Sequence, residues 1–222
     1  SRVSPDGEQG FPGNLTFTIT YTWNDANELM IEYNAVSDAD TILNITNHSY
    51  FNIGCGGQAA GDVLGAQVQI ASAKYTPINE KRLPTGEICD VAGTAMDFRE
   101  FHDIGSRIGE DDANVQTVSG YDHNYILPGN PGEICYAAAV RDPESRRIVE
   151  VYTDMPGVQL YTAKELVEQG GKGGITYGNF GGLCFETQQY PNGINEPKFP
   201  SPILKAGETF ESTTVFRLEF IS

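Results

Sequence analysis

The sequence predicts an all-β fold, a large antiparallel β-sandwich, and two patterns carry that prediction. Short segments alternate apolar and polar residues with a period of two, which is typical of strands buried on one face. Turn-forming clusters separate these segments, and the 25 glycines and 12 prolines among 222 residues favour turns over long helices. Because no internal repeat or linker divides the chain, we expect one β-sandwich domain over residues 1–222.

The clearest strand is predicted at residues 15–21, where Leu15, Phe17, Ile19 and Tyr21 share one face and three threonines share the other. Many short strands with turns between them are typical of a sandwich or barrel. Further strands of this kind are predicted at residues 29–36, 41–46, 68–71, 136–140, 147–153, 158–162, 183–188 and 213–220.

Helical periodicity is scarce along the chain. The spacing of Phe98, Phe101 and Ile104 predicts a turn or two of helix within residues 97–108, and His102 in this segment is expected to be solvated. Residues 163–169 predict one more helical turn before a run of glycines.

The charge balance excludes two classes of partner. Lys and Arg number 14 against 30 Asp and Glu, a formal net charge of −16. Nucleic-acid phosphates and anionic membranes repel such a polyanion, so we expect neither as a partner. The 39% of hydrophobic residues suffices for a core, yet no apolar run approaches the roughly 18–20 residues that span a bilayer, which indicates a soluble protein.

The cysteines and the glycosylation sequons bear on the compartment. Cys55, Cys89, Cys135 and Cys184 form no CxxC pair, so free thiols in a reducing compartment are favoured over a zinc site or a disulfide framework. Sequons occur at Asn14, Asn44 and Asn47. A glycan on Asn47 would obstruct the neighbouring His48. We therefore expect a cytoplasmic location, or an unoccupied sequon.

Among the three histidines, His48 has the most polar surroundings. If residues 44–50 continue a strand, Asn44, Thr46, His48 and Tyr50 share one face, which makes a poor core and a good floor for a polar ligand. The alternative is a structural histidine that binds a neighbouring loop.

Glu186 and Gln159 are polar residues within otherwise apolar strands. Burial of a carboxylate is costly and would raise its pKa towards neutrality, which suits a general base. The alternative for Glu186 is an acid at a strand edge that faces water. Gln159 can both donate and accept hydrogen bonds, as the recognition of a sugar hydroxyl requires.

Cofactor signatures are missing from the sequence. No acids or histidines stand at a recognisable metal-ligand spacing, no glycine-rich phosphate loop precedes a helix, and no GxSxG elbow occurs. We expect no metal and no cofactor.

These residues lie within a set of segments through which the chain resembles the aldose 1-epimerase family of galactose-mutarotase-like proteins. The matches run in order along nearly the whole chain. They are residues 4–13 (SPDGEQGFPG), 44–52 (NITNHSYFN), 120–124 (GYDHN), 156–159 (PGVQ) with Tyr161 and Thr162, 186–188 (ETQ) with Pro191 and Asn192, and 197–200 (PKFP).

The resemblance implies a cofactor-free β-sandwich enzyme that interconverts the α and β anomers of aldohexoses such as galactose and glucose. It implies that His48 is the general acid and Glu186 the general base. Asp122 and Gln159 would bind sugar hydroxyls, and Tyr50 would form a wall of the site. One acid and one base, on opposite sides of one pyranose ring, are the minimum that reversible ring opening needs.

Members of this family carry initial strands, an Asn-Arg pair and a His-Gly-Gly motif before the Ser-Pro-Asp-Gly segment. This sequence begins close to that segment, so it resembles the C-terminal two-thirds of a mutarotase. We therefore expect a complementary N-terminal polypeptide, or self-association through an uncovered sheet edge.

Two other functions are consistent with the residues. A non-catalytic sugar-binding sandwich would need no matched acid and base, so the presence of both His48 and Glu186 argues against it. A sugar-phosphate epimerase would need a basic pocket, which the excess of acids disfavours.

Overall fold

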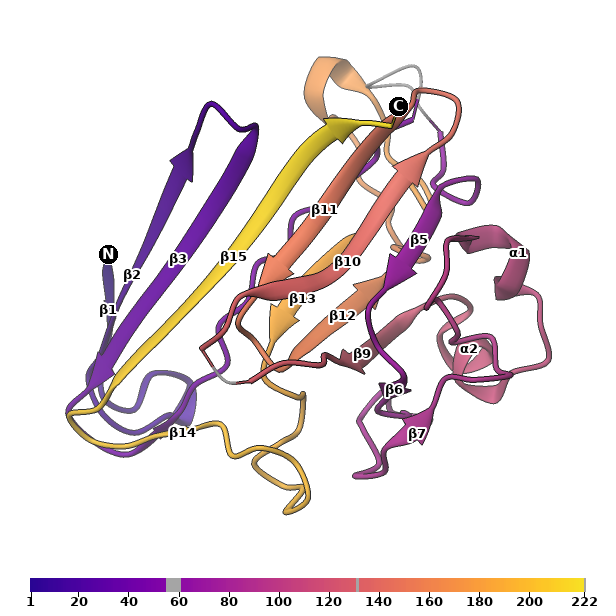
Figure 1. Ribbon diagram of the computed structural model, residues 1–222. Helices are drawn as coiled ribbons and strands as arrows, with labels where there is room; N and C mark the ends of the chain where they lie inside the picture. The colour runs from indigo at the N-terminus through magenta and orange to yellow at the C-terminus, as the bar shows by residue number, and fades with distance from the viewer. Residues whose placement is uncertain (55–60, 131, 222) are drawn as a thin grey trace.

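The computed structural model describes residues 1–54, 61–130 and 132–221 and contains two facing antiparallel sheets (Figure 1). The eight-stranded sheet has the order β1 (Arg2–Ser4), β2 (Leu15–Trp23), β3 (Glu28–Ser37), β15 (Thr209–Phe220), β11 (Arg147–Thr153), β10 (Cys135–Asp142), β5 (Gln67–Ile70) and β8 (His102–Asp103). The five-stranded sheet has the order β13 (Cys184–Gln188), β12 (Gly157–Tyr161), β9 (Asp122–Ile126), β6 (Lys74–Tyr75) and β7 (Cys89–Asp90). A short pair joins β14 (Ile203–Leu204) to β4 (Thr41–Ile42).

The period-two pattern at residues 15–21 is confirmed, and β2 continues to Trp23 in a hairpin with β3. The turn between these strands is built by Asn24, whose side-chain oxygen accepts hydrogen bonds from the backbone N–H groups of Ala26 and Glu28. Asn27 takes the left-handed conformation, with a φ of 57°, that closes the turn. Local turn chemistry thus sets the register of the longest hairpin.

The core lies between the two sheets. Leu160 and Phe185 of the five-stranded sheet are fully buried in one cluster with Val68, Val140 and Val151 of the eight-stranded sheet. In Figure 1 the strands β12 and β13 lie behind β10 and β11, whereas β2 and β3 extend away with no second sheet behind them. The five-stranded sheet therefore covers only part of the larger one, and its other face is free to carry a site.

The turn or two of helix predicted within residues 97–108 is confirmed by one short helix at the end of that segment. Within residues 97–108 only α1 (Ile104–Ile108) is helical, because Arg99 binds Asp97 in a local turn and His102 pairs with Val68 of β5. His102 is a half-buried strand residue rather than a solvated helical one.

The helical turn predicted at residues 163–169 is wrong. Ala163 has a left-handed φ of 49°, and Glu168 instead bridges to Tyr177. A second helix, α2 (Ala113–Val118), was not predicted, although Asp112 caps it and Val115 and Val118 are buried at helical spacing. The described residues also include 3₁₀ turns at Glu8–Gly10 and Lys172–Gly174.

The strand predicted at residues 41–46 is shorter than expected, and residues 43–50 belong to no sheet. Asn44 explains this, because its side chain binds the backbone N–H and C=O of Gln189 and replaces a ladder. The expected alternation of Asn44, Thr46, His48 and Tyr50 along one strand face is therefore wrong, and Asn44 ties down a neighbouring loop.

The described cysteines carry free thiols, with Cys184 buried and Cys89 and Cys135 half-buried. The prediction for Cys55 lies outside the described residues. Over residues 1–54, 61–130 and 132–221, no helix has the length and apolar character that a membrane crossing requires.

Candidate functional site

The register of β9, β12 and β13 places the predicted polar residues on one sheet face. Gln159 pairs with Glu186, and Tyr161, two residues further along β12, pairs with Asp122. Directly paired residues and residues two apart point the same way, so Asp122, Gln159 and Glu186 share a face. Leu160 lies between Gln159 and Tyr161 on β12, and its side chain points to the opposite face, into the core.

His48 reaches this polar face from the irregular segment after β4. Its Nε2 atom lies 3.6 Å from Oε1 of Glu186, and its side chain remains 50% exposed. The Tyr50 ring stacks on the imidazole at a centroid distance of 5.1 Å, and Tyr161 meets it edge-on at 5.7 Å. His48 and Tyr50 are thus brought next to Glu186, which is distant in sequence, at a surface that is open to solvent.

Glu186 is the buried acid of the site. Burial raises the pKa of its carboxyl to about 7, and the negative charge of Asp122 adds to that rise. Glu186 lies on β13, an edge strand of its sheet, but the alternative in which its side chain faces water is excluded, since the residue is only 8% exposed. A carboxyl group with a pKa near neutrality can both accept and return a proton under ordinary conditions.

Asp122 and Gln159 are joined in a hydrogen-bonded chain. Nε2 of Gln159 donates to Oδ1 of Asp122 at 2.6 Å, and Nε2 of Gln188 donates to Oε1 of Gln159 at 3.0 Å. Burial raises the pKa of Asp122, and the hydrogen bond from Gln159 opposes that rise. Gln188 was not singled out from the sequence, although it lies two residues beyond Glu186 and therefore faces the same way.

Gly157 leaves room on the site face of β12 for a side chain from β9. A Cβ at this position would overlap the side-chain oxygen of Asn124, which is buried on the same face. The glycine of the PGVQ segment therefore gives Asn124 its place beside Gln159, with which it pairs.

Tyr161 was not among the predicted site residues. Its ring contacts both His48 and Tyr50, with a centroid distance of 6.2 Å to Tyr50. The signal was present in the sequence, because Tyr161 lies two residues beyond Gln159 on the same strand. Tyr50, by contrast, was predicted as a wall and does lie against His48.

The other two histidines lie elsewhere. His123 points into the core, where burial lowers its pKa to about 4, and its Nδ1 accepts a hydrogen bond from the backbone N–H of Asp122. His102 lies in β8 beside Arg107.

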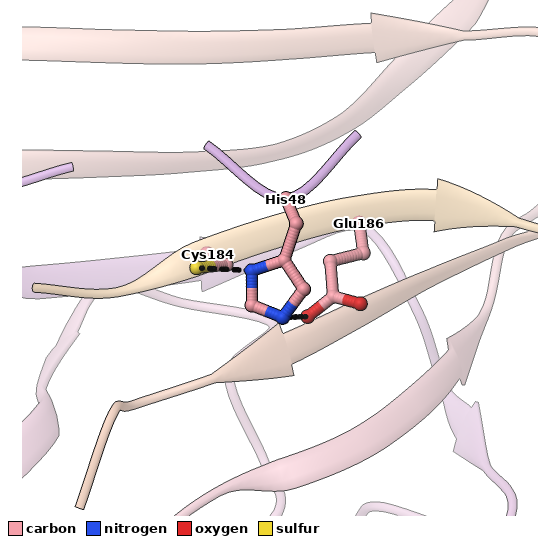
Figure 2. A group of neighbouring side chains, drawn as sticks. All are labelled: His48, Cys184 and Glu186. Atoms are coloured by element: carbon pink, nitrogen blue, oxygen red, sulfur yellow. Dashed lines mark hydrogen bonds and ion pairs between the residues drawn. The ribbon is translucent and has the colours of Figure 1, made fainter. Parts of the chain in front are cut away.

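One group of potential metal ligands is found in the described part of the chain, formed by His48, Cys184 and Glu186. Figure 2 shows that Cys184 approaches Nδ1 of the imidazole whereas Glu186 approaches Nε2. A single ion cannot replace both contacts, because the two nitrogens point in different directions. Burial also raises the pKa of the Cys184 thiol, which opposes the thiolate that a metal needs. The arrangement is a chain of polar contacts rather than a cage.

The expected gap between acid and base is not present. Nε2 of His48 and Oε1 of Glu186 lie only 3.6 Å apart, so a pyranose ring does not fit between these two atoms. The hydroxyl oxygen and the ring oxygen of a cyclic sugar are both bonded to C1, however. A histidine and a carboxylate that lie side by side can therefore each approach one of them.

The facing sheets first define a class, the galactose-mutarotase-like β-sandwich. A crystal structure of galactose 1-epimerase from Lactobacillus acidophilus NCFM superimposes with a TM-score of 0.82 at 30% identity, over 100% of this chain and 62% of that one. An aldose epimerase homologue from C. elegans gives a TM-score of 0.87 at 24% identity, over 100% of this chain and 65% of that one, and supports the fold.

The sequence comparisons narrow the class to a family. The family model described as aldose 1-epimerase matches residues 1–217. Human galactose mutarotase is 41% identical over 98% of this chain, and aldose 1-epimerase of Escherichia coli K12 is 36% identical over 96%. The chain belongs to the aldose 1-epimerase family. It spans 61% of the length of each of these two relatives.

Proposed function

We propose that this chain carries the acid–base site of an aldose 1-epimerase, which interconverts the α and β anomers of an aldohexose. The observation that carries the proposal is the contact of His48 with Glu186, a buried carboxyl group whose pKa is raised to about 7. A matched acid and base on one sheet face, next to groups that bind hydroxyls, is what ring opening of a hemiacetal requires.

In the proposed reaction the Glu186 carboxylate accepts the proton of the C1 hydroxyl while His48 donates a proton to the ring oxygen. The bond from C1 to the ring oxygen breaks and leaves an open-chain aldehyde. Rotation about the C1–C2 bond exposes the other face of the carbonyl. Ring closure then returns both protons in the reverse direction, so His48 and Glu186 end in their starting states.

Asp122 and Gln159 are proposed to hold the sugar. The amide of Gln159 is oriented by Gln188 and Asp122, so its remaining N–H points in a defined direction. The names of the relatives, galactose mutarotase and galactose 1-epimerase, favour galactose as a substrate, with glucose as the second candidate.

The site disfavours a sugar phosphate as substrate. Arg82 borders Asp122 in the adjoining hollow, and its guanidinium is already paired with Glu165 at 2.7 Å. Lys164 also borders this hollow and lies over the ring of Phe180. A phosphate would have to compete with Glu165 for Arg82.

The test is the equilibration of α-galactose and α-glucose, followed by polarimetry or proton NMR, with glucose 6-phosphate measured in parallel. Glu186→Gln keeps the shape of the side chain and removes the base, so turnover should fall by about 10²–10⁴ while sugar binding persists. His48→Asn should give a comparable loss. Near-normal turnover of Glu186→Gln would refute the mechanism, and binding without turnover in the unmodified protein would favour the sugar-binding alternative.

We further propose that part of the eight-stranded sheet is covered by additional polypeptide in the functioning protein. Tyr21, Trp23 and Phe220 are 65%, 58% and 75% exposed, although they lie on the same face as the buried Ile31 and Phe216. Exposed aromatic residues that continue a core face are typical of an interaction surface. The occupant favoured here is a polypeptide segment of the kind that makes up the unmatched part of the relatives, since this chain spans 61% of their length.

A cytoplasmic location is proposed from the thiols and from Asn47. Cys89, Cys135 and Cys184 are free, which is consistent with a reducing compartment. The Asn47 side chain is buried, so this fold leaves no room for a glycan there. Mass spectrometry of the native protein would test whether these thiols are free and whether Asn47 carries a glycan.

A further inference from the structure

The polar contacts of the site continue beyond the proposed acid to a buried thiol. Sγ of Cys184 lies 3.3 Å from Nδ1 of His48, on the side of the imidazole away from Glu186 (Figure 2). Cys184 begins β13 and pairs with Tyr161, so the register places it on the same sheet face as Glu186, two residues later. It is fully buried.

The direction of this contact is set by the two neighbours of the imidazole. The Glu186 carboxylate beside Nε2 can only accept a hydrogen bond when it is ionised, so it favours the ring proton on Nε2 and leaves Nδ1 as the acceptor. Burial raises the pKa of the Cys184 thiol, and the charges of Glu186 and Asp122 raise it further, so the group keeps its proton and can donate it. A neutral imidazole has one nitrogen that donates and one that accepts. If the thiol donates to Nδ1, the ring proton must reside on Nε2, the nitrogen that faces Glu186.

We propose that Cys184 is a positioning residue that holds neutral His48 in the tautomer with its proton on Nε2. The stacked Tyr50 and the edge of Tyr161 restrain the plane of the ring, but neither provides a polar partner for Nδ1. Throughout the described part of the chain, the Cys184 thiol is the recorded polar partner of that nitrogen. Selection of the tautomer therefore depends on Cys184 at Nδ1 together with Glu186 at Nε2.

The catalytic consequence rests on the proposed function. A general acid must carry its proton on the atom that approaches the substrate. With the proton on Nε2, neutral His48 presents a hydrogen-bond donor beside Glu186, where the two oxygens on C1 of a sugar would lie. With the proton on Nδ1, the neutral ring would present a lone pair to those oxygens instead. Transfer of the proton itself to the ring oxygen takes place from the imidazolium form, which becomes a neutral imidazole.

The primary experiment measures the tautomer directly. Heteronuclear NMR of the imidazole nitrogens, with the His48 signals assigned by their loss in His48→Gln, distinguishes a protonated Nε2 from a protonated Nδ1. The unmodified protein should show the Nε2-protonated form of neutral His48. Cys184→Ala should give a mixture of tautomers, and Cys184→Ser, which restores a donor, should recover the original form at least in part.

Cys135→Ala is the matched control. The Cys135 thiol also makes weak hydrogen bonds, to the backbone oxygens of Pro128 and Thr153, but it lies on β10 away from the site. Its loss should leave the His48 signals unchanged. In a turnover assay, Cys184→Ala should lower kcat by about 3- to 10-fold, as expected for one hydrogen bond to an orienting group, with little change in KM. Cys135→Ala should change neither constant.

The proposal is overturned if the unmodified protein shows His48 protonated on Nδ1, or if Cys184→Ala leaves the tautomer unchanged, whatever happens to kcat. The unmodified protein alone supplies the first of these results, so a poorly folded variant does not prevent a decision. Failure of the proposed function is recognised separately, as near-normal turnover in Glu186→Gln. The NMR measurement does not require that the chain be active.

Discussion

At the scale of single residues, the burial of Glu186 carries a free-energy cost whenever its carboxyl group is charged. A carboxyl group whose pKa is about 7 when folded and 4.5 by its ordinary value binds its proton more tightly in the folded state. The folded protein therefore loses stability as the pH rises from about 4.5 to about 7, because ionisation is easier in the unfolded chain. The raised pKa that suits Glu186 to its proposed role as a base thus makes it a destabilising residue at neutral and higher pH.

We expect Glu186→Gln to raise the free energy of unfolding at about pH 8 by about 1–3 kcal/mol, since a neutral amide avoids the cost of a buried charge. Below about pH 4.5 the effect should largely vanish. Urea denaturation at the two pH values measures both. Glu144→Gln, at an exposed position, is the control and should change stability little at either pH. A destabilised Glu186→Gln at high pH would show that the carboxylate is not strained by burial.

Asp122 also influences Glu186 through its charge. Because the negative charge of Asp122 contributes to the raised pKa of Glu186, Asp122→Asn should lower that pKa. The base must be deprotonated to act, so the acid limb of the kcat/KM profile should move to lower pH, while KM rises through weaker sugar binding. Mutarotation rates measured across a pH series test this. An acid limb that stays in place would mean that another group controls it.

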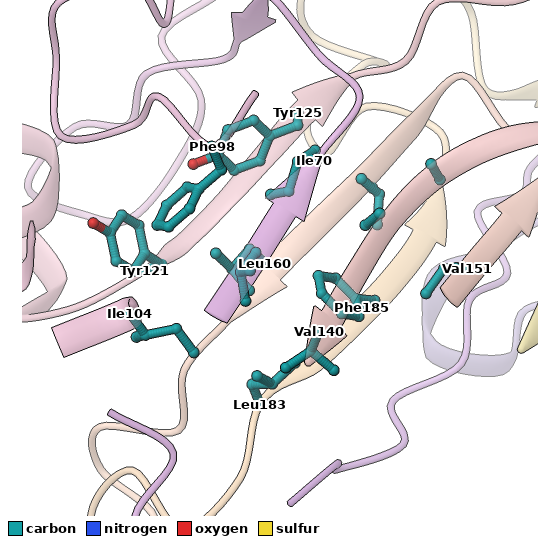
Figure 3. Packing of buried hydrophobic residues seen from close by; sticks show 14 of the residues in the cluster. Ile70, Phe98, Ile104, Tyr121, Tyr125, Val140, Val151, Leu160, Leu183 and Phe185 are labelled. Carbon is teal, nitrogen blue, oxygen red and sulfur yellow. The ribbon is translucent and has the colours of Figure 1, made fainter. Parts of the chain in front are cut away.

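At the scale of elements, one face of β12 belongs to the core and the other to the proposed sugar-binding site. Figure 3 shows Leu160 and Phe185 packed with Ile70 and Val140 between the sheets. Gln159, the preceding residue, points the other way and binds Asp122. Alternate residues of one strand thus serve the core and the site, because successive side chains of a strand point to opposite faces.

Substitutions on the two faces of β12 should therefore have different consequences. Leu160→Ala should cost about 2–5 kcal/mol of stability, because it leaves a cavity in a close-packed core. The folded fraction should keep its affinity for sugar. Gln159→Ala should cost about 1 kcal/mol and raise KM roughly tenfold. Urea denaturation and sugar titration of both variants separate the effects, and an equal loss of affinity in the two would contradict this division.

At the scale of the whole molecule, the five-stranded sheet leaves part of the larger sheet uncovered. Trp23 pairs with Leu29, and Leu29 pairs with the buried Phe216, so the exposed aromatic residues lie in direct continuation of the core. A face of this kind is stabilised by removal from water.

We expect the isolated chain to associate or to bind an apolar dye through this face. Trp23→Thr combined with Phe220→Thr should reduce both effects without unfolding the protein, because threonine is well tolerated in strands. Val36→Thr is the control, since Val36 is an exposed apolar residue on the opposite face of β3. Sedimentation and dye binding measure the outcome. A stable monomer that binds no dye would argue against any occupant of this face.

The pattern of side chains along the chain determined much of this protein by itself. Period-two alternation identified β2, β3, β11 and β15, because a half-buried strand must alternate. An acid within an apolar strand made Glu186 a candidate for a functional residue, because buried charge is costly, although the pattern also allowed an acid that faces water. Glycine and proline clusters located most turns.

Only the tertiary structure decided the rest, since the remaining features depend on contacts between distant segments. Whether residues 97–103 form helix depended on the pairing of His102 with β5, and local spacing does not contain that information. His48 was predicted as part of a strand, yet it reaches the site from an irregular segment that Asn44 ties to Gln189. The contact of Cys184 with Nδ1 of His48 joins residues 136 positions apart, so no local pattern could have indicated it.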